Sequence, residues 1–476
     1  MGAELIFIPS PGVGHLGSTV EIAKLLISRD ERLSITVLVM KFPHDTGVTA
    51  YTRPLQKDAP NRIVFVDLPQ NESLISTPKS FFTSFIESQT SPVRDSVRQI
   101  VSRSDSNNLA GFVIDMFCTP MIDVANEFGV PTYVFFTSGA AFLGLQFYHL
   151  SLSDEHNQDL TEYKDMDVEL FIPSFINPVP AKVLPSVMLN KEGSTMLQSI
   201  SRRFKEAKAI LVNTFAELEP HAIKALGDNG KIPPIYHVGP IINLKNKLGT
   251  TQNHSSEDGI ISWLDNQPPS SVVFLCFGSF GSFDEGQVRE IAHGLEQSGQ
   301  RFLWSLRRRP EKMELPKDYE NPEEVLPEGF IERTSGMGKV IGWAPQTAIL
   351  SHPAVGGFVS HCGWNSTLES IWCGVPMATW PIYAEQQINA FELVKELGMA
   401  VEIKMDYRED YIFAPENNLV VTADQIEKGM RCLMMDGESE MRKKVEEMKE
   451  KSRMAMVEGG SSYISLGHFF EDVMGN

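Results

Sequence analysis

The sequence has few cysteines, no paired-cysteine motif and no long hydrophobic run. No two of its five cysteines have the Cys-x-x-Cys spacing that is typical of structural zinc sites. An odd number of scattered cysteines favours a reducing compartment over a disulfide framework. No apolar run approaches the roughly 18 residues of a transmembrane helix, and no basic segment of a signal sequence stands at the start. The sequence therefore predicts a cytoplasmic protein without membrane insertion.

Positive charge is also scarce. The 476 residues include 42 Lys and Arg against 61 Asp and Glu, which gives a formal net charge of −19. Such a surface repels nucleic acid and anionic lipid headgroups, so we expect neither as a partner. Any phosphate group that the protein binds has to be held locally, by backbone amides or by single polar side chains.

A chain of this length rarely forms one core, and its pattern indicates two α/β domains. Short apolar runs, such as residues 5–9 and 132–136, alternate with stretches of helical periodicity, which is typical of parallel sheets covered by helices. A proline-rich and then polar stretch interrupts this pattern. We therefore predict two doubly wound, Rossmann-like domains, in residues 1–240 and 259–460, joined by a linker in residues 241–258. Their ligand cleft should lie between them, at the carboxyl ends of both sheets.

Two charged segments stand outside this pattern. Residues 152–169 are acidic and polar, and they predict an exposed loop. Arg307, Arg308 and Arg309 follow a predicted strand. A solvated loop is the expected role for them, and contact with a ligand phosphate is the alternative.

A glycine-rich motif follows the first predicted strand. Gly12, Gly14 and Gly17 have the G-x-G-x-x-G spacing of dinucleotide-binding sites. That interpretation requires an acidic residue at the end of the second strand to bind the ribose, but the second strand ends in Met40, Lys41 and Phe42. The absence of this acidic residue therefore argues against a nicotinamide-dependent dehydrogenase.

His15 lies within this motif and is a candidate general base. It stands just beyond the first strand, where α/β proteins place their ligands, and its ordinary pKa suits proton transfer near neutrality. Asp115 ends another predicted strand among apolar residues, where a carboxylate needs a partner. If Asp115 accepts a hydrogen bond from one ring nitrogen of His15, the other nitrogen can take a substrate proton. The alternative is that His15 is a turn residue and Asp115 caps a helix.

The segment from Trp343 to Gln386 predicts a cradle for a nucleotide sugar. Trp343 offers a flat face for a base, and residues 360–366 lead from a strand into a helix. The unpaired amides of a helix start bind phosphate. Further phosphate contacts are expected from His361, Gly363, Asn365 and Ser366.

Three side chains of the same segment suit hydroxyl groups. Glu369 lies one helical turn after Ser366 and could accept both ribose hydroxyls, while Glu385 and Gln386 could contact a sugar. Any single residue of this segment could equally serve packing or a turn, so the prediction depends on the ordered whole.

This segment of 44 residues is similar along its full length to the plant secondary product glycosyltransferase signature, which marks the UDP-sugar-dependent family 1 glycosyltransferases. The resemblance extends over the chain, because the His15 loop, the Asp115 strand and the loop Phe277-Gly278-Ser279 occur in the family's order. It implies the GT-B fold, with the acceptor in the N-terminal domain and the UDP-sugar in the C-terminal domain. It also implies that a helix in residues 461–476 packs back on the N-terminal domain, and that the protein is a monomer.

The resemblance assigns roles residue by residue. His15 resembles the catalytic base and Asp115 its partner. The residues that resemble contacts of the donor are Trp343 and Ala344 for uracil, Gln346 and Glu369 for ribose, His361, Asn365 and Ser366 for diphosphate, and Trp364, Glu385, Gln386 and Thr137 for glucose, with Ser279 and Ser305 as weaker matches.

The implied reaction is a single inverting displacement. His15 deprotonates an acceptor hydroxyl, which attacks the anomeric carbon opposite UDP and gives a β-glucoside. Gln386 suggests glucose as the sugar. The helix start and His361 meet the charge of the leaving group, so neither a cofactor nor a metal is expected. An Asp-x-Asp motif at Asp165 and Asp167 resembles the metal site of another glycosyltransferase fold, but it lies in the predicted loop and is taken as coincidental.

The acceptor is expected to be small and apolar. Met116, Phe117, Phe142 and Phe147 are candidates to line its pocket, although they could equally be core residues. The family suggests a plant phenolic such as a flavonoid, a stilbene or a simple phenol, with a terpenoid or a hormone as the alternative. A protein that binds nucleotide sugars without turnover is a further alternative, but it would not need both His15 and Asp115.

Overall fold

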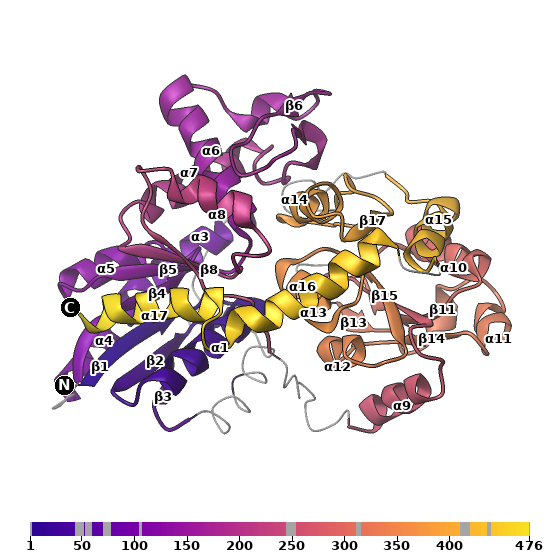
Figure 1. The fold of residues 1–476 in the computed structure, drawn as a ribbon, viewed down its shortest axis with the longest axis horizontal. Coiled ribbons are helices and arrows are strands. Elements are labelled where there is room, and N and C mark those ends of the chain that lie inside the picture. Colours follow the sequence, from indigo (N-terminus) through magenta and orange to yellow (C-terminus); the bar gives the residue numbers. More distant parts are fainter. Residues whose placement is uncertain are drawn as a thin grey trace.

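The structure is a computed structural model. It describes residues 2–42, 52, 60–69, 78–103, 107–243, 254–310, 316–409, 419–435 and 439–475. Two α/β units lie side by side, each built around a parallel sheet (Figure 1). The expectation of two Rossmann-like units is confirmed.

The first sheet has seven parallel strands in the order β3-β2-β1-β4-β5-β8-β9. The strand order reverses between β1 and β4, so their carboxyl ends open into the crevice where doubly wound sheets bind ligands. The chain leaves β1 towards His15, and β4 ends at Asp115. The strands are β1 (Gly2–Ile8), β2 (Leu33–Val39), β3 (Ile63–Asp67), β4 (Asn107–Asp115), β5 (Thr132–Phe136), β8 (Ala209–Val212) and β9 (Ile235–His237).

Alternation along β1 explains why both faces of this sheet are covered. Leu5 and Phe7 face one core, whereas Ile6 and Ile8 face the other, and all four are fully buried. A strand that is buried on both faces needs a continuous apolar run. The covering elements of this unit are α1 (Val13–Arg29), α3 (Pro78–Ser88), α4 (Thr90–Arg103), α5 (Met121–Glu127), α6 (Ala140–His156), α7 (Lys191–Phe204) and α8 (Pro220–Gly227).

The second sheet has six parallel strands in the order β14-β11-β10-β15-β16-β17. Its order reverses between β10 and β15, so the segment that follows β15 faces the cleft. The strands are β10 (Val272–Cys276), β11 (Arg301–Ser305), β14 (Gly338–Ile341), β15 (Val355–Ser360), β16 (Met377–Thr379) and β17 (Ala400–Glu402). The helical elements are α9 (His254–Asp265), α10 (Glu285–Ser298), α11 (Phe330–Thr334), α12 (Gln346–Leu350), α13 (Trp364–Cys373), α14 (Gln386–Phe391), the π-helical η4 (Glu392–Glu396) and α15 (Ala423–Leu433).

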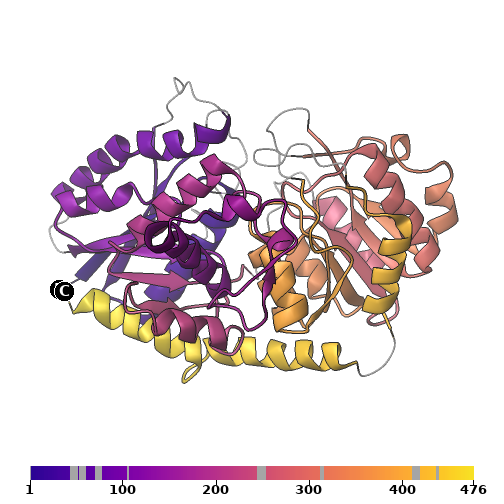
Figure 2. The same cartoon turned by 90° about the horizontal axis from the view of Figure 1, so that it is seen from above.

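The last two helices return from the second unit to the first. Figures 1 and 2 show α16 (Glu440–Met456) and α17 (Ser461–Met474) running along one side of the molecule, in yellow. On the first unit, the ring of Phe469 packs edge-on against Tyr133 at 4.9 Å. The hydroxyl of Tyr236 donates to Asp472 over 2.8 Å. None of the described helices is long and apolar enough to cross a membrane.

The structure corrects several local predictions. Helix α1 begins at Val13, so Gly14 and Gly17 are helical and only Gly12, with φ of 125°, makes the turn. Helix α9 begins at His254, within the predicted linker, because Ile260 and Leu264 give it a buried face.

Residues 152–169 are likewise not a loop throughout. Helix α6 continues to His156, and a short helix η1 (Leu160–Tyr163) follows. Leu160 is fully buried, and the carboxylate of Asp159 caps η1 by accepting from Thr161 N. The prediction failed because a single buried leucine gives no periodic signal.

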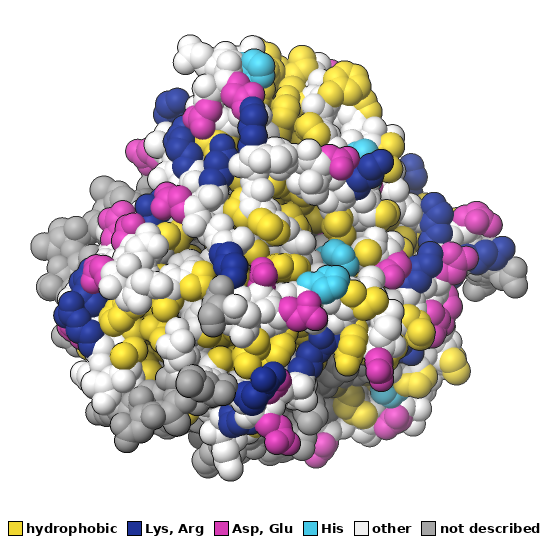
Figure 3. Space-filling view, turned by 60° about the vertical axis from the view of Figure 1, so that its left-hand side comes forward, with side chains coloured by type: hydrophobic (Ala, Val, Ile, Leu, Met, Phe, Trp, Pro, Cys, Tyr) yellow, Lys and Arg dark blue, Asp and Glu magenta, His cyan; other side chains and the backbone are white. Residues whose placement is uncertain are grey.

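Two small antiparallel hairpins project from the sheets. β6 (Glu169–Leu170) pairs with β7 (Val179–Pro180), and β12 (Arg307–Arg308) pairs with β13 (Lys317–Asp318). Figure 3 shows hydrophobic side chains at the upper end of the molecule, where β6 lies in Figure 1. There the side chains of Phe171 and Ile176 are 80% and 68% exposed.

Candidate functional site

His15 and Asp115 lie together at the switch point of the first sheet. The first turn of α1 carries His15, and its Nδ1 lies 2.7 Å from Asp115 Oδ2. The Asp115 side chain has no exposed surface, whereas that of His15 is 32% exposed. The other carboxylate oxygen, Oδ1, accepts from Phe117 N over 3.1 Å, which fixes the orientation of Asp115. This carboxylate holds the proton on Nδ1 and leaves Nε2 as an acceptor.

The pKa of His15 is raised above its ordinary value. Burial acts to lower this pKa, but the charge of Asp115, its hydrogen bond and the charge of Glu385 together outweigh the effect of burial. The hydroxyl of Thr137 also lies 3.1 Å from His15 Nδ1 and donates to Met116 Sδ at 3.8 Å. Thr137 and Met116 therefore contact the pair at its buried side.

An aromatic wall extends from His15. The ring of Phe117 lies 5.6 Å from the imidazole, and Phe82 of α3 packs edge-on against Phe117 at 5.2 Å. Phe42, which follows β2, continues the wall beyond Phe82. Sequence reasoning found Phe117 but missed Phe42 and Phe82, because they come from segments that are distant in sequence and carry no motif.

The other two residues predicted for the acceptor pocket, Phe142 and Phe147, are buried in the core of the first unit. Phe142 packs against Phe136 at 5.9 Å, and Phe147 packs against Phe204 at 6.3 Å. These contacts join α6 to the strand and helix beside it in the core of the first unit. Both side chains therefore pack in the core of this unit.

The start of α13 contacts the start of α1. Asn365 Nδ2 donates to Gly14 O over 3.4 Å, and Asn365 Oδ1 accepts from Ser18 Oγ over 3.3 Å. A Cβ at Gly14 would lie 3.8 Å from Asn365 Nδ2, which is an ordinary van der Waals contact. His15, the candidate base, is therefore the direct neighbour of Gly14, which contacts the start of α13. The first amides of a helix have no partner within the helix and can bind a ligand.

His361 is enclosed beside this helix start. A Cβ at Gly278 or at Gly363 would lie 2.5 or 2.7 Å from His361 Nε2, so both positions require glycine. Burial lowers the pKa of His361 to about 4, which keeps the ring neutral. Ser279 follows Gly278, and its side chain is exposed.

Three polar side chains meet where α12 and α13 begin. Gln346 Nε2 donates to Ser366 Oγ over 2.9 Å and to Glu369 Oε2 over 2.7 Å. Burial raises the pKa of Glu369 to about 7. Because all three carry hydroxyl, amide or carboxyl groups, this cluster can exchange its internal hydrogen bonds for bonds to a ligand.

Trp343 and Ala344 follow β14 at the next position along the cleft. Ser305 Oγ donates to Gly342 O over 2.7 Å, and Trp343 N donates to Asp318 Oδ1 over 2.9 Å. Ala344 is buried, and Trp343 is partly exposed. The backbone before the indole is thus held by two side chains, of which sequence reasoning had found only Ser305.

Glu385 and Gln386 stand at the start of α14, facing the first unit. Ser138 follows Thr137 in the chain, and its Oγ donates to Glu385 Oε1 over 3.2 Å. Gln386 Oε1 accepts from Ile382 N over 2.9 Å and from Tyr383 N over 3.0 Å. These two bonds fix the amide so that its NH₂ group is the outward donor.

The Trp364 side chain points into the first unit. Its Nε1 donates to Asn213 O over 2.7 Å, and a Cβ at Gly139 would lie 2.8 Å from the indole. Trp364 therefore ties the start of α13 to the first unit through its ring.

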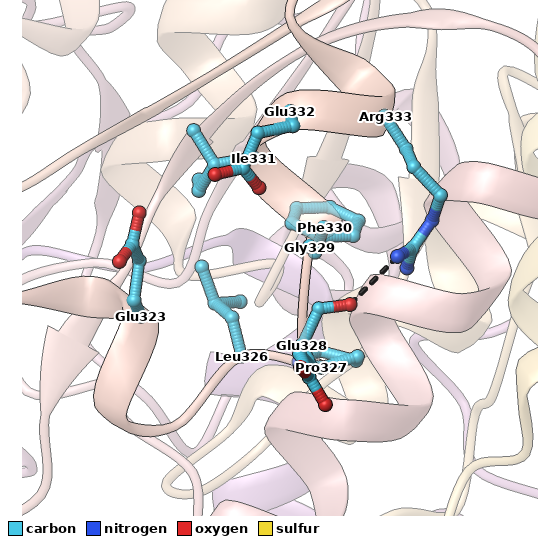
Figure 4. Close-up of a pocket in the computed structure, with 9 residues that line it drawn as sticks. All are labelled: Glu323, Leu326, Pro327, Glu328, Gly329, Phe330, Ile331, Glu332 and Arg333. Atoms are coloured by element: carbon cyan, nitrogen blue, oxygen red, sulfur yellow. Dashed lines mark hydrogen bonds between the residues drawn. The ribbon is translucent and has the colours of Figure 1, made fainter.

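The charged segments outside the cleft have other partners. Arg307 pairs with Asp318 at 2.9 Å, and Arg309 pairs with Glu409 at 2.5 Å. Within the described residues, no three His, Cys, Asp or Glu side chains form a group that could hold a metal ion. A surface cavity of about 600 Å³ lies at residues 323–333, around Leu326 and Phe330, and contains none of the predicted site residues (Figure 4).

Comparison with known proteins places these features in context. Residues 241–410 match the family model described as UDP-glucoronosyl and UDP-glucosyl transferase. The chain is 57% identical over 481 residues to UDP-glucose flavonoid 3-O-glucosyltransferase 6 of Fragaria ananassa, covering 99% of this chain and 98% of the relative. It is also 57% identical to UDP-glycosyltransferase 71E1 of Stevia rebaudiana, with the same coverage.

Solved structures match over the whole chain as well. The crystal structure of Medicago truncatula UGT71G1 complexed with UDP-glucose is 45% identical, with a TM-score of 0.88, and 99% of this chain and 98% of that chain are covered. Phytolacca americana UGT2, complexed with UDP-2fluoro-glucose and pterostilbene, is 32% identical, with a TM-score of 0.84 and coverage of 99% and 100%.

Proposed function

As a member of the plant family 1 UDP-dependent glycosyltransferases, this chain is a UDP-glycosyltransferase, and we propose that it transfers glucose from UDP-glucose to a hydroxyl group of a small apolar acceptor. The observation that carries the proposal is the His15–Asp115 pair, placed against the start of α13. The mechanism is a single displacement that inverts the anomeric carbon and yields a β-glucoside.

The base in this mechanism is His15. Its Nε2 takes the proton of the acceptor hydroxyl as that oxygen attacks the anomeric carbon, and the bond to the UDP oxygen breaks. Asp115, bonded to Nδ1 over 2.7 Å, stabilises the imidazolium that forms. Thr137, whose hydroxyl lies 3.1 Å from His15 Nδ1, completes the buried side of the pair and is a further proposed contact of the sugar.

The donor is held by the second unit. Trp343 stacks on uracil and Ala344 presents its backbone to the base. The cluster of Gln346 and Glu369 accepts the ribose hydroxyls. Charge that develops on the diphosphate is met by the amides at the start of α13, by Asn365 and Ser366, and by the neutral ring of His361. The chain's own donors therefore stabilise the leaving group.

Glucose is the donor sugar in this proposal. The carbonyl of Gln386 is held by two backbone N–H groups, so its NH₂ is left to donate to a sugar hydroxyl. Glu385, steadied by Ser138, accepts from neighbouring hydroxyls of the sugar. The name of the relative from Fragaria ananassa, which specifies UDP-glucose, supports the same choice.

The acceptor proposed is a plant phenolic. The wall formed by Phe117, Phe82 and Phe42 presents aromatic surface beside His15, and such surface suits a flat aromatic acceptor. A relative named as a flavonoid 3-O-glucosyltransferase and a similar structure that holds pterostilbene support this class. A terpenoid or hormone alcohol is the second candidate, because an apolar wall accepts it as well.

The test is turnover by the purified protein. UDP-glucose is supplied with a panel of flavonoids, stilbenes, simple phenols and terpenoid alcohols in the presence of EDTA, and products are read by mass spectrometry and by proton NMR of the anomeric position. The proposal expects phenolic products that are heavier by one hexose and β-configured. An α-linked product, or turnover that EDTA abolishes, would contradict the mechanism; preference for terpenoid alcohols would replace the acceptor class alone.

A further inference from the structure

The hairpin β12–β13 lies against the segment that carries Trp343. Asp318, the last residue of β13, accepts from Trp343 N over 2.9 Å through Oδ1. Neither the glycine-rich loop nor the segment from Trp343 to Gln386 contains this residue. It reaches Trp343 from 25 positions earlier in the chain.

Asp318 is itself held in place. Arg307 Nε lies 2.9 Å from the same oxygen, Oδ1, and the two residues are opposite each other in the hairpin. This contact with Asp318 is an ion pair, and another nitrogen of the guanidinium, Nη2, donates to Pro316 O. The Arg307 side chain is only 14% exposed, so its charge is poorly hydrated and favours a fixed carboxylate partner.

The peptide before Trp343 is held by a second side chain. Ser305 Oγ donates to Gly342 O over 2.7 Å. A Cβ at Gly342 would lie 2.3 Å from Asp318 Cγ, so the carboxylate packs directly on the glycine. Glycine is needed here because of this close approach.

We propose that Asp318 is a positioning residue for the donor: with Arg307 and Gly342 it fixes the backbone of Trp343, so that the indole is oriented for uracil before UDP-glucose binds. This inference rests on the proposed function, which assigns uracil stacking to Trp343. Orientation before binding avoids the loss of freedom that a mobile side chain would suffer in the complex. The effect belongs to UDP affinity and not to the displacement, since the carboxylate of Asp318 accepts from Trp343 N, and Trp343 is the residue assigned to uracil.

The test measures the Kd of UDP by isothermal titration and the kinetic constants for UDP-glucose. Asp318→Ala is expected to weaken UDP about tenfold, as for loss of one hydrogen bond to a charged group. It should raise the KM for UDP-glucose by a similar factor and leave kcat unchanged. Asp318→Asn keeps an oxygen for Trp343 N and should recover most of the affinity. Glu320→Ala, an exposed acidic residue in the same segment, is the control and should bind UDP like the wild type.

A double variant distinguishes positioning from a general structural role. Gly342→Ala should weaken UDP as Asp318→Ala does, because its Cβ displaces the carboxylate, whereas adding Gly342→Ala to Asp318→Ala should change little further. Unchanged UDP affinity in Asp318→Ala, with Trp343→Ala binding weakly, would overturn the inference and leave the proposed site intact. If Trp343→Ala also binds UDP normally, the uracil assignment itself fails. A fall in kcat at unchanged KM would also overturn the inference.

Discussion

At the scale of single residues, the proposed mechanism makes the reaction depend on the protonation of His15. The proposed base is active when its ring is neutral, and its pKa is raised because Asp115 and Glu385 together outweigh burial. As pH falls through this raised pKa, the ring becomes protonated and the rate must fall. The acid limb of the pH profile should therefore lie above the ordinary histidine value of about 6.5.

Replacing Asp115 by asparagine should move this limb. Asp115→Asn removes the charge that raises the pKa of His15, so the acid limb of kcat/KM should shift to lower pH. The maximal rate should fall roughly 10²- to 10⁴-fold, because the imidazolium loses its partner. The profile is measured with an alcohol acceptor, whose own hydroxyl does not ionise in this range. If the acid limb of kcat/KM does not move, a group other than His15 controls it.

Gln386 offers a test that separates the sugar from the nucleotide. Gln386→Ala removes the amide proposed to contact glucose but no contact proposed for UDP. The KM for UDP-glucose should rise about tenfold, as for a lost hydrogen bond of about 1.4 kcal/mol. The Kd of UDP alone, measured by titration, should stay within about twofold of the wild type. Equal weakening of both ligands would mean that Gln386 acts by supporting the loop at Ile382 and Tyr383.

At the scale of elements, strands with an apolar run could be predicted, whereas short or charged elements could not. Residues 132–136 were predicted as a strand and coincide with β5, because the run is entirely apolar and buried. The sequence predicts only a proline-rich boundary where β9 lies, since three half-buried residues carry no alternation. The hairpin β12–β13 has only charged residues, so its pairing depends on tertiary contacts such as that between Arg307 and Asp318.

In the site, too, residues that are close in the chain could be predicted, whereas residues joined only by the fold could not. The residues of the predicted donor segment follow one another in the chain, and the structure brings Gln346, Ser366 and Glu369 together. The contacts of Ser138 with Glu385 and of Asn213 with Trp364 join residues that are 247 and 151 positions apart. No local pattern reports such pairs, so the supporting residues appear only once the two units are placed together.

A buried acidic pair joins α6 to the second unit. Both oxygens of Glu219 accept from the first amides of α6, at Ala140 N over 2.8 Å and Ala141 N over 2.6 Å. Glu392, at the start of η4, hydrogen-bonds Glu219, and only 5% of it is exposed. Burial raises the pKa of Glu392 well above its ordinary value, and the charges of Glu219 and Glu396 add to this. Glu392 therefore keeps its proton and donates to Glu219.

This pair should make the folded protein sensitive to alkali. A raised pKa means that the folded state holds a proton which the unfolded state has released above the ordinary glutamate pKa, so the free energy of unfolding falls as pH rises. Glu392→Gln keeps a donor for Glu219 but cannot ionise. Its melting temperature should exceed that of the wild type at alkaline pH, and the difference should shrink towards weakly acidic pH. Thermal unfolding of both proteins across this pH range checks the prediction. A difference in melting temperature that does not change with pH would contradict a proton shared by Glu392 and Glu219.

At the scale of the whole molecule, the cleft depends on bonds between the two units. Arg408 donates to Lys182 O and to Leu184 O, and Glu396 accepts from Ile176 N and Asn177 N. The rings of Phe175 and Phe391 pack edge-on at 5.9 Å beside these contacts. The position of His15 relative to the proposed donor site is therefore fixed by these contacts and by the bond of Trp364 to Asn213 O.

Trp364→Phe tests whether this alignment matters for the reaction. The variant keeps an aromatic ring but leaves Asn213 O without its donor, which should reduce the free energy of unfolding by about 1–3 kcal/mol. Because the start of α13 is then less firmly aligned with His15, kcat should fall about tenfold, in keeping with the steep dependence of rate on orientation. The Kd of UDP should change little, and titration checks it. A normal kcat in a destabilised variant would show that alignment does not depend on this bond.

The most direct measurement compares kcat/KM of the wild type and His15→Ala with UDP-glucose and one good phenolic acceptor, alongside the Kd of UDP for both proteins. The mechanism predicts that the variant binds UDP within about twofold of the wild type and loses on the order of 10²- to 10⁴-fold in kcat/KM. A variant that binds UDP and turns over like the wild type would contradict the central claim that His15 is the base.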